Sequence, residues 1–156
     1  MPLIIRFKLF LWYFGFMKVP LLGHLKPKLI VLNEEDVVIK LSLNHRSKNH
    51  LNSMYFGALA VGADIAGGLH GFYHAKALKR PISLAFKSFQ AQFIKRPESD
   101  VFFVCHQGAL VKSMIEESAI AKTRVNQMLS IHAFINYPEQ AEKVAEFTLE
   151  LSIKIT

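Results

Sequence analysis

Residues 49–78 read NHLNSMYFGALAVGADIAGGLHGFYHAKAL, a long apolar segment that predicts a buried helix. Between Lys48 and Lys76 this segment carries a single formal charge, Asp64. A lone carboxylate is costly to bury in an apolar helix, and buried carboxylates with shifted pKa values serve as general bases or nucleophiles. Asp64 is therefore a candidate catalytic residue. The alternative is a carboxylate that simply reaches solvent or a partner at the helix surface.

The same helix is long enough to cross a bilayer, so its surroundings decide its role. Its glycines, at positions 57, 62, 67, 68 and 71, suit close packing against a sheet or a second helix. The flanking segments alternate apolar and polar residues with a period of two, most regularly over residues 125–136 and 145–156. Such alternation is typical of antiparallel strands with one buried face.

Further strands are predicted at residues 27–33, 37–43, 84–94 and 101–105, and a short helix at 110–122. The expected order is a terminal helix, two strands, one long helix and then about four strands. A sheet wrapped around a single apolar helix buries both elements. We therefore expect an α+β fold in which residues 1–156 form one domain, with an N-terminal helix at 1–20 and a loop and central helix at 49–78.

The charge distribution is strongly basic in two stretches of the chain. The formal net charge is +7, no acidic residue precedes Glu34, and none lies between Asp64 and Glu98. Such patches suit an anionic partner, although a basic surface that only aids solubility is equally consistent. The single cysteine, Cys105, cannot form an intrachain disulfide and lies in an apolar strand, which predicts a buried structural thiol in a reducing, cytoplasmic setting.

Residues 3–17 are rich in aromatic and aliphatic side chains but contain Arg6 and Lys8. A signal peptide would carry its charges ahead of the apolar run and would end at a small-residue cleavage site. We interpret the segment as an amphipathic helix that either packs on the domain or makes a weak contact with a membrane.

Two histidines, His70 and His74, are spaced four residues apart on the central helix. This spacing could place both on one metal ion, but no glutamate of the HExxH kind and no third ligand accompany them. A pair on the helix surface is the preferred interpretation, and we expect no metal. No phosphate loop, nucleophile elbow, paired-cysteine zinc motif or nucleic-acid-binding module is present, so we expect no nucleic-acid partner.

Asn49 and Asp64, fifteen residues apart with Gly57 between them, resemble a motif of the hotdog-fold thioesterases. The nearest resemblance is to the small PaaI-like group and its DUF4442 relatives. The segment from Phe93 to Pro97 resembles the aromatic-x-x-x-Pro strand end of that family. The resemblance covers roughly residues 27–156 and implies a hotdog fold, an antiparallel sheet wrapped around a long central helix. Tyr55 and Phe56 stand where the family has His and its first Gly.

The resemblance implies an acyl-CoA thioesterase that needs no separate cofactor, because coenzyme A enters as part of the substrate. Asp64 would be the base or nucleophile, the Gly57 N–H would polarise the thioester carbonyl, and Asn49 would orient water or that carbonyl. The two helix positions are too far apart to act together within one chain, so the family arrangement implies a homodimer, or a tetramer of stacked dimers. The candidate substrate-binding residues are His50, Tyr55, Phe56, Ser88, Lys95 and Arg96. The alternative is a non-catalytic hotdog module that binds an acyl chain or thioester, or only dimerises.

Overall fold

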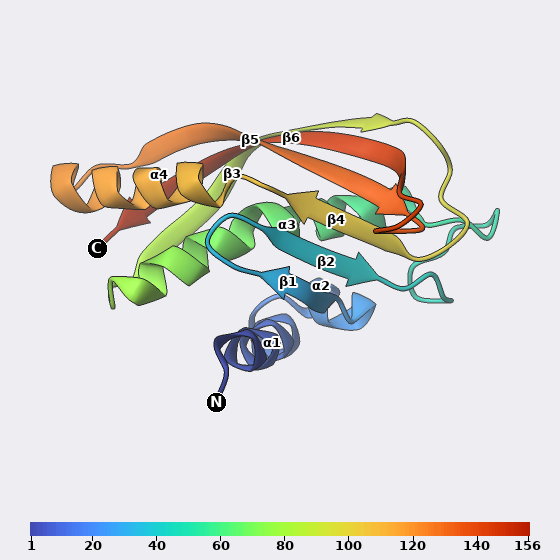
Figure 1. Ribbon diagram of the computed structural model, residues 1–156, viewed down its shortest axis with the longest axis horizontal. Coiled ribbons are helices and arrows are strands. Elements are labelled where there is room, and N and C mark those ends of the chain that lie inside the picture. The colour runs from blue at the N-terminus through green and yellow to red at the C-terminus, as the bar shows by residue number, and fades with distance from the viewer.

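The computed structural model describes residues 1–156 and shows an antiparallel sheet curved around a long helix (Figure 1). The helical elements are α1 (Leu3–Tyr13), the π-helical turn η1 (Phe14–Lys18), α2 (Pro20–Leu25), α3 (Phe56–Ala77) and α4 (Gly108–Ala121). The strands are β1 (Lys28–Leu32), β2 (Val37–Leu41), β3 (Ile82–Phe93), β4 (Val101–Cys105), β5 (Val125–Ile135) and β6 (Glu142–Ile155). The predicted α+β architecture is confirmed.

The six strands form one sheet in the order β1-β2-β4-β5-β6-β3, with every neighbouring pair antiparallel. The alternation predicted from residues 145–156 is present in β6, where the apolar positions are buried and the intervening positions are more exposed, except for the buried Ser152. Two strands lie at the edges of the sheet. One is the short β1 and the other is β3, which spans 12 residues and pairs only with β6.

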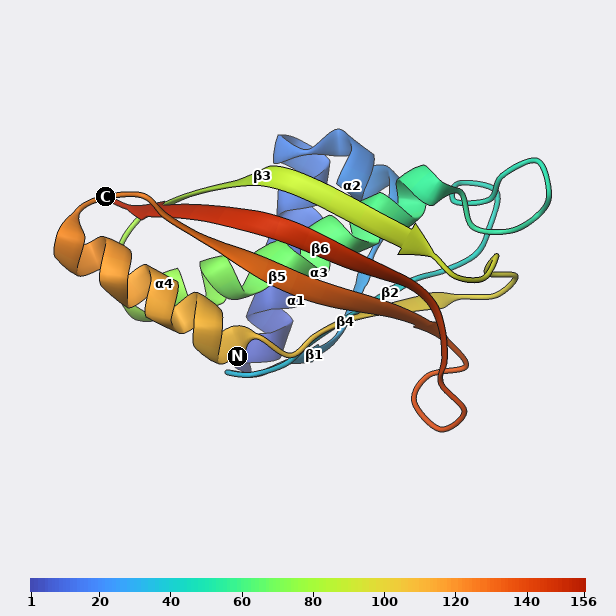
Figure 2. The ribbon, with the colours of Figure 1, turned by 90° about the horizontal axis from the view of Figure 1, so that it is seen from above.

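The helix α3 crosses the concave face of the sheet (Figures 1 and 2), and side chains from the helix and from the sheet together form the core. Gly62 allows α3 to approach β4 closely, because the Phe103 ring from β4 occupies the space that a Cβ at this position would need. The helix begins at Phe56 and not at the start of the segment 49–78, since residues 50–55 form a loop that closes through the Lys48–Met54 bridge. None of the helices combines the length and apolar character that a membrane span requires.

The N-terminal helix α1 forms a third layer, on the side of α3 that faces away from the sheet (Figure 1). Its inner face packs on α3 through aromatic pairs, with ring centroids 5.7 Å apart for Phe7 and Tyr73 and 5.2 Å apart for Phe10 and Phe72. The predicted packing of this helix on the domain is therefore confirmed. The short α2, which begins at Pro20, was not predicted. It folds back on η1 where the backbones of Gly15 and Gly23 touch, a contact that leaves no room for side chains.

Candidate functional site

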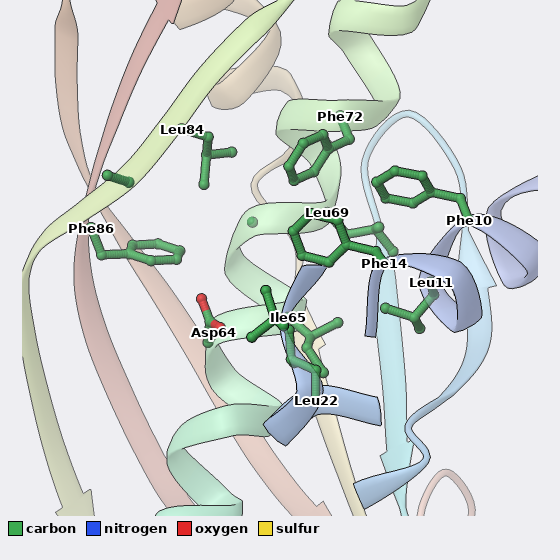
Figure 3. A pocket seen from close by; sticks show the side chains of 13 residues that line it. Phe10, Leu11, Phe14, Leu22, Asp64, Ile65, Leu69, Phe72, Leu84 and Phe86 are labelled. Atoms are coloured by element: carbon green, nitrogen blue, oxygen red, sulfur yellow. The ribbon is translucent and has the colours of Figure 1, made fainter. Parts of the chain in front are cut away.

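Asp64 lies at an apolar pocket of about 230 Å³ between the N-terminal segment, α3 and β3 (Figure 3). Asp64 is the only ionisable residue among those that line the pocket. The lining residues are Phe10, Leu11, Phe14, Val19, Leu22, Asp64, Ile65, Gly68, Leu69, Phe72, Leu84, Ala85 and Phe86. In Figure 3 the carboxylate points into the space below the Phe86 ring. The pocket thus brings one carboxylate together with walls suited to an aliphatic or aromatic group.

Burial raises the pKa of Asp64 above its ordinary value of 3.8. The side chain is half-buried, and no hydrogen bond or ion pair within the chain compensates for its lost hydration. A carboxylate with an elevated pKa is a stronger base than one in water, and it keeps free lone pairs for a bound water or substrate. The geometry therefore supports a chemical role for Asp64.

The N-terminus of α3 presents backbone N–H groups without partners inside the chain. Tyr55 is extended and precedes the helix, no side chain caps it, and the first helical N–H that finds an acceptor is that of Leu59, which bonds to the Tyr55 carbonyl oxygen. The free donors include the N–H of Gly57, at the positive end of the helix dipole. Such donors can stabilise a developing negative charge.

Tyr55 limits access to these donors from within the same chain. The Tyr55 ring lies where a Cβ at Gly57 would be, so glycine is required here by the aromatic neighbour. Tyr55 and Phe56 pack against each other, with ring centroids 4.7 Å apart, and both are largely exposed. Tyr55 and Phe56 therefore form an aromatic cover at the helix start.

A second hollow, of about 260 Å³, lies beside the helix start and contains several of the predicted residues. It is lined by Asn49, Met54, Phe56, Leu59, Phe93, Ile94, Lys95, Arg96 and Pro97. Its two cationic groups are already paired: the Lys95 Nζ lies 2.7 Å from a Glu142 carboxylate oxygen, and Arg96 lies 3.2 Å from Glu98. Both pairs are exposed and therefore weak enough to be exchanged for a ligand phosphate.

Asn49 organises the loop before α3. Its Oδ1 accepts hydrogen bonds from the Leu51 N–H at 2.9 Å, the Ser53 N–H at 3.2 Å and the Ser53 hydroxyl at 3.1 Å. The amide oxygen is therefore occupied by the loop, whereas the amide nitrogen remains free to donate. Asn49 fixes the position of the helix start, and only its nitrogen is available to orient a ligand.

Three of the predicted binding residues, His50, Tyr55 and Ser88, line neither hollow. His50 is exposed in the loop and makes no hydrogen bond. Ser88 is opposite Glu150 on the sheet face that points away from α3, because a β-bulge between Phe86 and Ser88 changes the alternation of the strand. The structure therefore brings together Asn49, Phe56, Lys95 and Arg96 near Gly57, and holds Asp64 in a separate pocket.

The histidine pair is buried, contrary to the predicted surface pair. His70 and His74 pack with ring centroids 5.7 Å apart beneath the turn between β1 and β2. His70 Nε2 donates a hydrogen bond to the Asn33 carbonyl oxygen at 3.0 Å, and burial lowers the pKa of His70 to about 4. No third His, Cys, Asp or Glu joins these two in a cluster that could hold a metal ion. Cys105 is buried, as predicted, and burial raises its pKa to about 11.

The contribution of the N-terminal segment to the Asp64 pocket was missed from the sequence. Phe10, Phe14 and Leu22 line one side of the pocket, and β3 lines the other. The spacing of Phe7, Phe10 and Phe14 marks a helix face that must pack on something apolar, but nothing in the sequence indicates that this face reaches residues 64–72.

Comparisons with known proteins establish the fold. No protein-family model matches the sequence, and no curated protein sequence matches it. A solved structure of a probable thioesterase of unknown function from Pseudomonas aeruginosa is similar over 100% of this chain and 99% of its own, with 21% identity and a TM-score of 0.74. A candidate thioesterase from Shewanella oneidensis is similar over 96% and 98% of the two chains, with 9% identity and a TM-score of 0.78. A thioesterase from Haemophilus influenzae covers 99% of this chain and 92% of its own, with 13% identity and a TM-score of 0.66. At these identities the likeness shows the hotdog fold and nothing finer.

Proposed function

We propose that this protein is a homodimeric thioesterase that hydrolyses an acyl-CoA to the free acid and coenzyme A. The observation that carries the proposal is the position of Asp64, the one ionisable side chain of an apolar pocket, with a pKa raised by burial. The proposal also places the chain with the PaaI-like group, on the spacing of Asn49, Gly57 and Asp64. The fold that it shares with solved thioesterases is consistent with this activity.

In the proposed reaction Asp64 acts on the thioester carbonyl carbon. As a general base, it takes a proton from water while the hydroxide adds to the carbonyl carbon; the C–S bond then breaks and the proton passes to the departing thiolate. As a nucleophile, it forms a mixed anhydride and expels the thiolate; water then hydrolyses the anhydride, which restores the Asp64 carboxylate, and a proton from that water passes to the thiolate. Both routes need an ionised Asp64 and a donor for the developing oxyanion.

That donor cannot be the Gly57 N–H of the same chain. Gly57 and Asp64 are seven residues apart on α3, which corresponds to roughly 10 Å of helix rise. Two antiparallel copies of α3 would bring Asp64 of one subunit to the helix start of the other. The hollow that contains Asn49, Lys95 and Arg96 would then adjoin Asp64 of the second copy, and its cations would meet the coenzyme A phosphates.

The free edge of β3 supports a dimer. This strand is 12 residues long, pairs only through β6, and leaves a full row of N–H and C=O groups unpaired on its other side. Native proteins seldom leave a long edge strand open, and they often protect such strands with charged side chains. In β3 only Lys87 is charged. Pairing of two β3 edges about a two-fold axis would satisfy the unpaired N–H and C=O groups of both strands. It would also place the two Asp64 pockets next to the junction between the subunits.

The assay for this proposal is thiol release from acyl-CoAs with short, medium, long and aromatic acyl groups. We expect turnover of at least one class, and a loss of about 100-fold or more in Asp64→Ala and Asp64→Asn. Both variants should remain folded, as judged by thermal unfolding. Full activity in Asp64→Asn would exclude Asp64 as base or nucleophile.

A second candidate function is an acyl-thioester-binding module without turnover. The aromatic cover that Tyr55 places over Gly57 favours it, because this ring must move before a carbonyl oxygen can reach the free N–H groups. Binding of a non-hydrolysable acyl-CoA thioether, measured by calorimetry, without turnover of any thioester would identify such a module.

A further inference from the structure

The outward face of α1 and η1 carries a continuous apolar ridge. Ile5, Leu9, Trp12 and Phe16 follow one another at spacings of four, three and four residues, which places them on one side of a helix. This side faces away from the protein: Trp12 is 67% exposed and Phe16 is 66% exposed. Their rings stack in parallel, with centroids 5.7 Å apart and an interplanar angle of 1°. A helix that packs one apolar face on the domain and exposes a second one needs a further apolar partner.

Basic residues flank this ridge on both sides. By helical geometry Arg6 and Lys8 lie on opposite flanks, each roughly 80° around the helix from the ridge. No acidic residue precedes Glu34 in the chain. A wide hollow next to the start of α1 adds Lys76, Lys79, Arg80 and Lys112 to Arg6, against the single carboxylate of Glu34.

We propose that this face docks on an anionic membrane surface, with the apolar ridge in the outer acyl region and the basic residues among the headgroups. A helix that lies in a membrane interface has a buried apolar stripe with aromatic residues and flanking Lys or Arg side chains that reach the headgroups. The exposed ridge and the basic surroundings are independent features, and an anionic lipid surface satisfies both. The proposal rests on the exposed ridge and the basic residues around it, and it holds whether or not Asp64 hydrolyses thioesters.

A second copy of this chain fits the same face less well. Two copies joined through their ridges would bring two strongly basic surfaces together, with no acidic residue in the first 33 positions to compensate them. The helix also lies on the membrane and does not cross it, since α1 and η1 together span 16 residues, roughly 24 Å of rise and short of a bilayer core.

Trp12 is the only tryptophan of the chain, so its fluorescence reports directly on the ridge. Vesicles of phosphatidylcholine with about one quarter phosphatidylglycerol should shift its emission to the blue and protect it from acrylamide. Vesicles of phosphatidylcholine alone should produce a much smaller change. An unchanged spectrum and unchanged quenching with anionic vesicles at low salt would overturn the proposal, as would equal effects of both vesicle types.

Flotation with the anionic vesicles tests the ridge by mutation. Trp12→Ser/Phe16→Ser should reduce partitioning about tenfold or more, whereas Ile120→Ser, which removes a side chain that is 84% exposed on α4, should leave it unchanged. Equal partitioning of both variants would overturn the proposal. If the wild type ignores vesicles but Trp12→Ser/Phe16→Ser lowers its mass in light scattering, the ridge joins two copies and the proposal is again wrong.

The basic flank is tested by Arg6→Gln/Lys8→Gln, with Lys154→Gln on β6 as the matched control. The flank variant should bind anionic vesicles several-fold more weakly and with a shallower dependence on salt, whereas the control should match the wild type. Inorganic phosphate at millimolar concentration should not displace the protein from vesicles. Displacement by phosphate, with no blue shift of Trp12, would assign the basic groups to a small anion and overturn the membrane assignment.

Discussion

Gly57 and Asp64 lie on the same face of α3, about two helical turns apart, and only Asp64 lines the apolar pocket. The pocket at Asp64 is lined by the N-terminal segment and β3, whereas the helix start adjoins the loop around Asn49 and the end of β3. No single carbonyl can reach both groups in one chain. If both act in catalysis, each active site is made from two chains.

Subunit complementation tests this arrangement. In the double variant Tyr55→Ala/Gly57→Pro, proline removes the N–H at position 57 and is tolerated because this position lies in the first helical turn. The Tyr55→Ala substitution removes the ring that the proline side chain would otherwise meet. We expect this variant and Asp64→Ala each to be inactive alone. A random mixture of the two chains should regain about a quarter of wild-type activity, since half of the dimers carry one intact site of two.

Tyr55→Ala alone is the control for complementation, because it keeps the Gly57 N–H and should retain turnover. Refolding the two inactive variants together, followed by the thiol-release assay, gives the measurement. A mixture that stays inactive would place the whole site in one chain.

The β3 edge provides a separate test of the dimer. Ser88→Lys/Gln90→Lys adds two charges to the outward sheet face of the edge strand, where a two-fold pairing would bring like charges together. We expect the dimer to dissociate in light-scattering measurements and thioester turnover to fall with it. Ser130→Lys, on the same sheet face but on the interior strand β5, should stay dimeric. A dimer that survives the edge substitutions would locate the interface elsewhere.

Asp64→Asn should raise stability at neutral pH. Burial raises the pKa of Asp64, so the folded protein holds this proton more tightly than the unfolded chain does. The resulting stabilisation is complete below pH 3.8 and is lost as pH rises through the elevated pKa. At pH 7 the ionised carboxylate is therefore a cost, and its removal should raise Tm by roughly 1–3 °C.

The gap in Tm between Asp64→Asn and wild type should narrow as pH falls toward 3.8. Asp100→Asn is the matched control with the opposite sign, because Asp100 accepts a hydrogen bond from the Leu43 N–H at 2.8 Å and pairs with Lys40 at 3.1 Å. Its substitution should lower Tm. Scanning calorimetry at several pH values would contradict this account if Asp64→Asn were destabilising at pH 7.

The order of the strands and the long helix could be predicted from the sequence because each follows from local periodicity. The segment 101–105 coincides with β4, and the alternation over 125–136 and 145–156 corresponds to β5 and β6. Asp64 could be singled out for the same reason, since a lone charge in an apolar run is visible without any tertiary information.

The parts of the candidate site that were not predicted depend on contacts between distant segments. The pocket wall formed by Phe10 and Phe14 exists only because α1 packs on α3. Ser88 was expected to bind substrate, but the bulge after Phe86 shifts the alternation of β3, so Phe86 and Phe89 lie on the sheet face toward α3 and Ser88 lies on the opposite face. The burial of His70 and His74 likewise comes from the turn between β1 and β2, far away in the sequence.

Gly68→Ala should stabilise the fold and narrow the pocket. A Cβ at Gly68 would lie 3.7 Å from Leu84 Cδ2 and 3.8 Å from Phe86 Cζ, both ordinary contacts. Replacing a helical glycine with alanine contributes about 0.5–1 kcal/mol to stability. If the pocket holds the acyl chain, this added methyl, one turn from Asp64, should raise KM for long acyl-CoAs while leaving short ones unchanged.

Gly62→Ala is the contrasting variant on the same helix. Its Cβ would enter the space of the buried Phe103 ring, so we expect a loss of about 1–3 kcal/mol through overpacking. Urea unfolding measures both substitutions. Equal effects at the two glycines would contradict the packing described for α3, and an unchanged KM profile in Gly68→Ala would argue against the pocket as the acyl site.

His70 should make the protein sensitive to mild acid. Its pKa is lowered to about 4 because the ring is buried, and its Nδ1 has no partner. A depressed folded pKa contributes stability above pH 6.5 that is lost as pH falls through about 4. The shift from 6.5 to about 4 corresponds to roughly 3 kcal/mol at most.

His70→Gln should flatten the fall in unfolding free energy between pH 6.5 and 4, while His50→Gln, in the exposed loop, should leave it as in the wild type. The slope is the diagnostic quantity, because His70→Gln also disturbs packing and lowers stability at every pH. His74, whose pKa burial also lowers, should maintain part of the slope. Urea titrations at half-unit pH steps give the comparison, and parallel curves for His70→Gln and wild type would show that His70 is not the group that titrates.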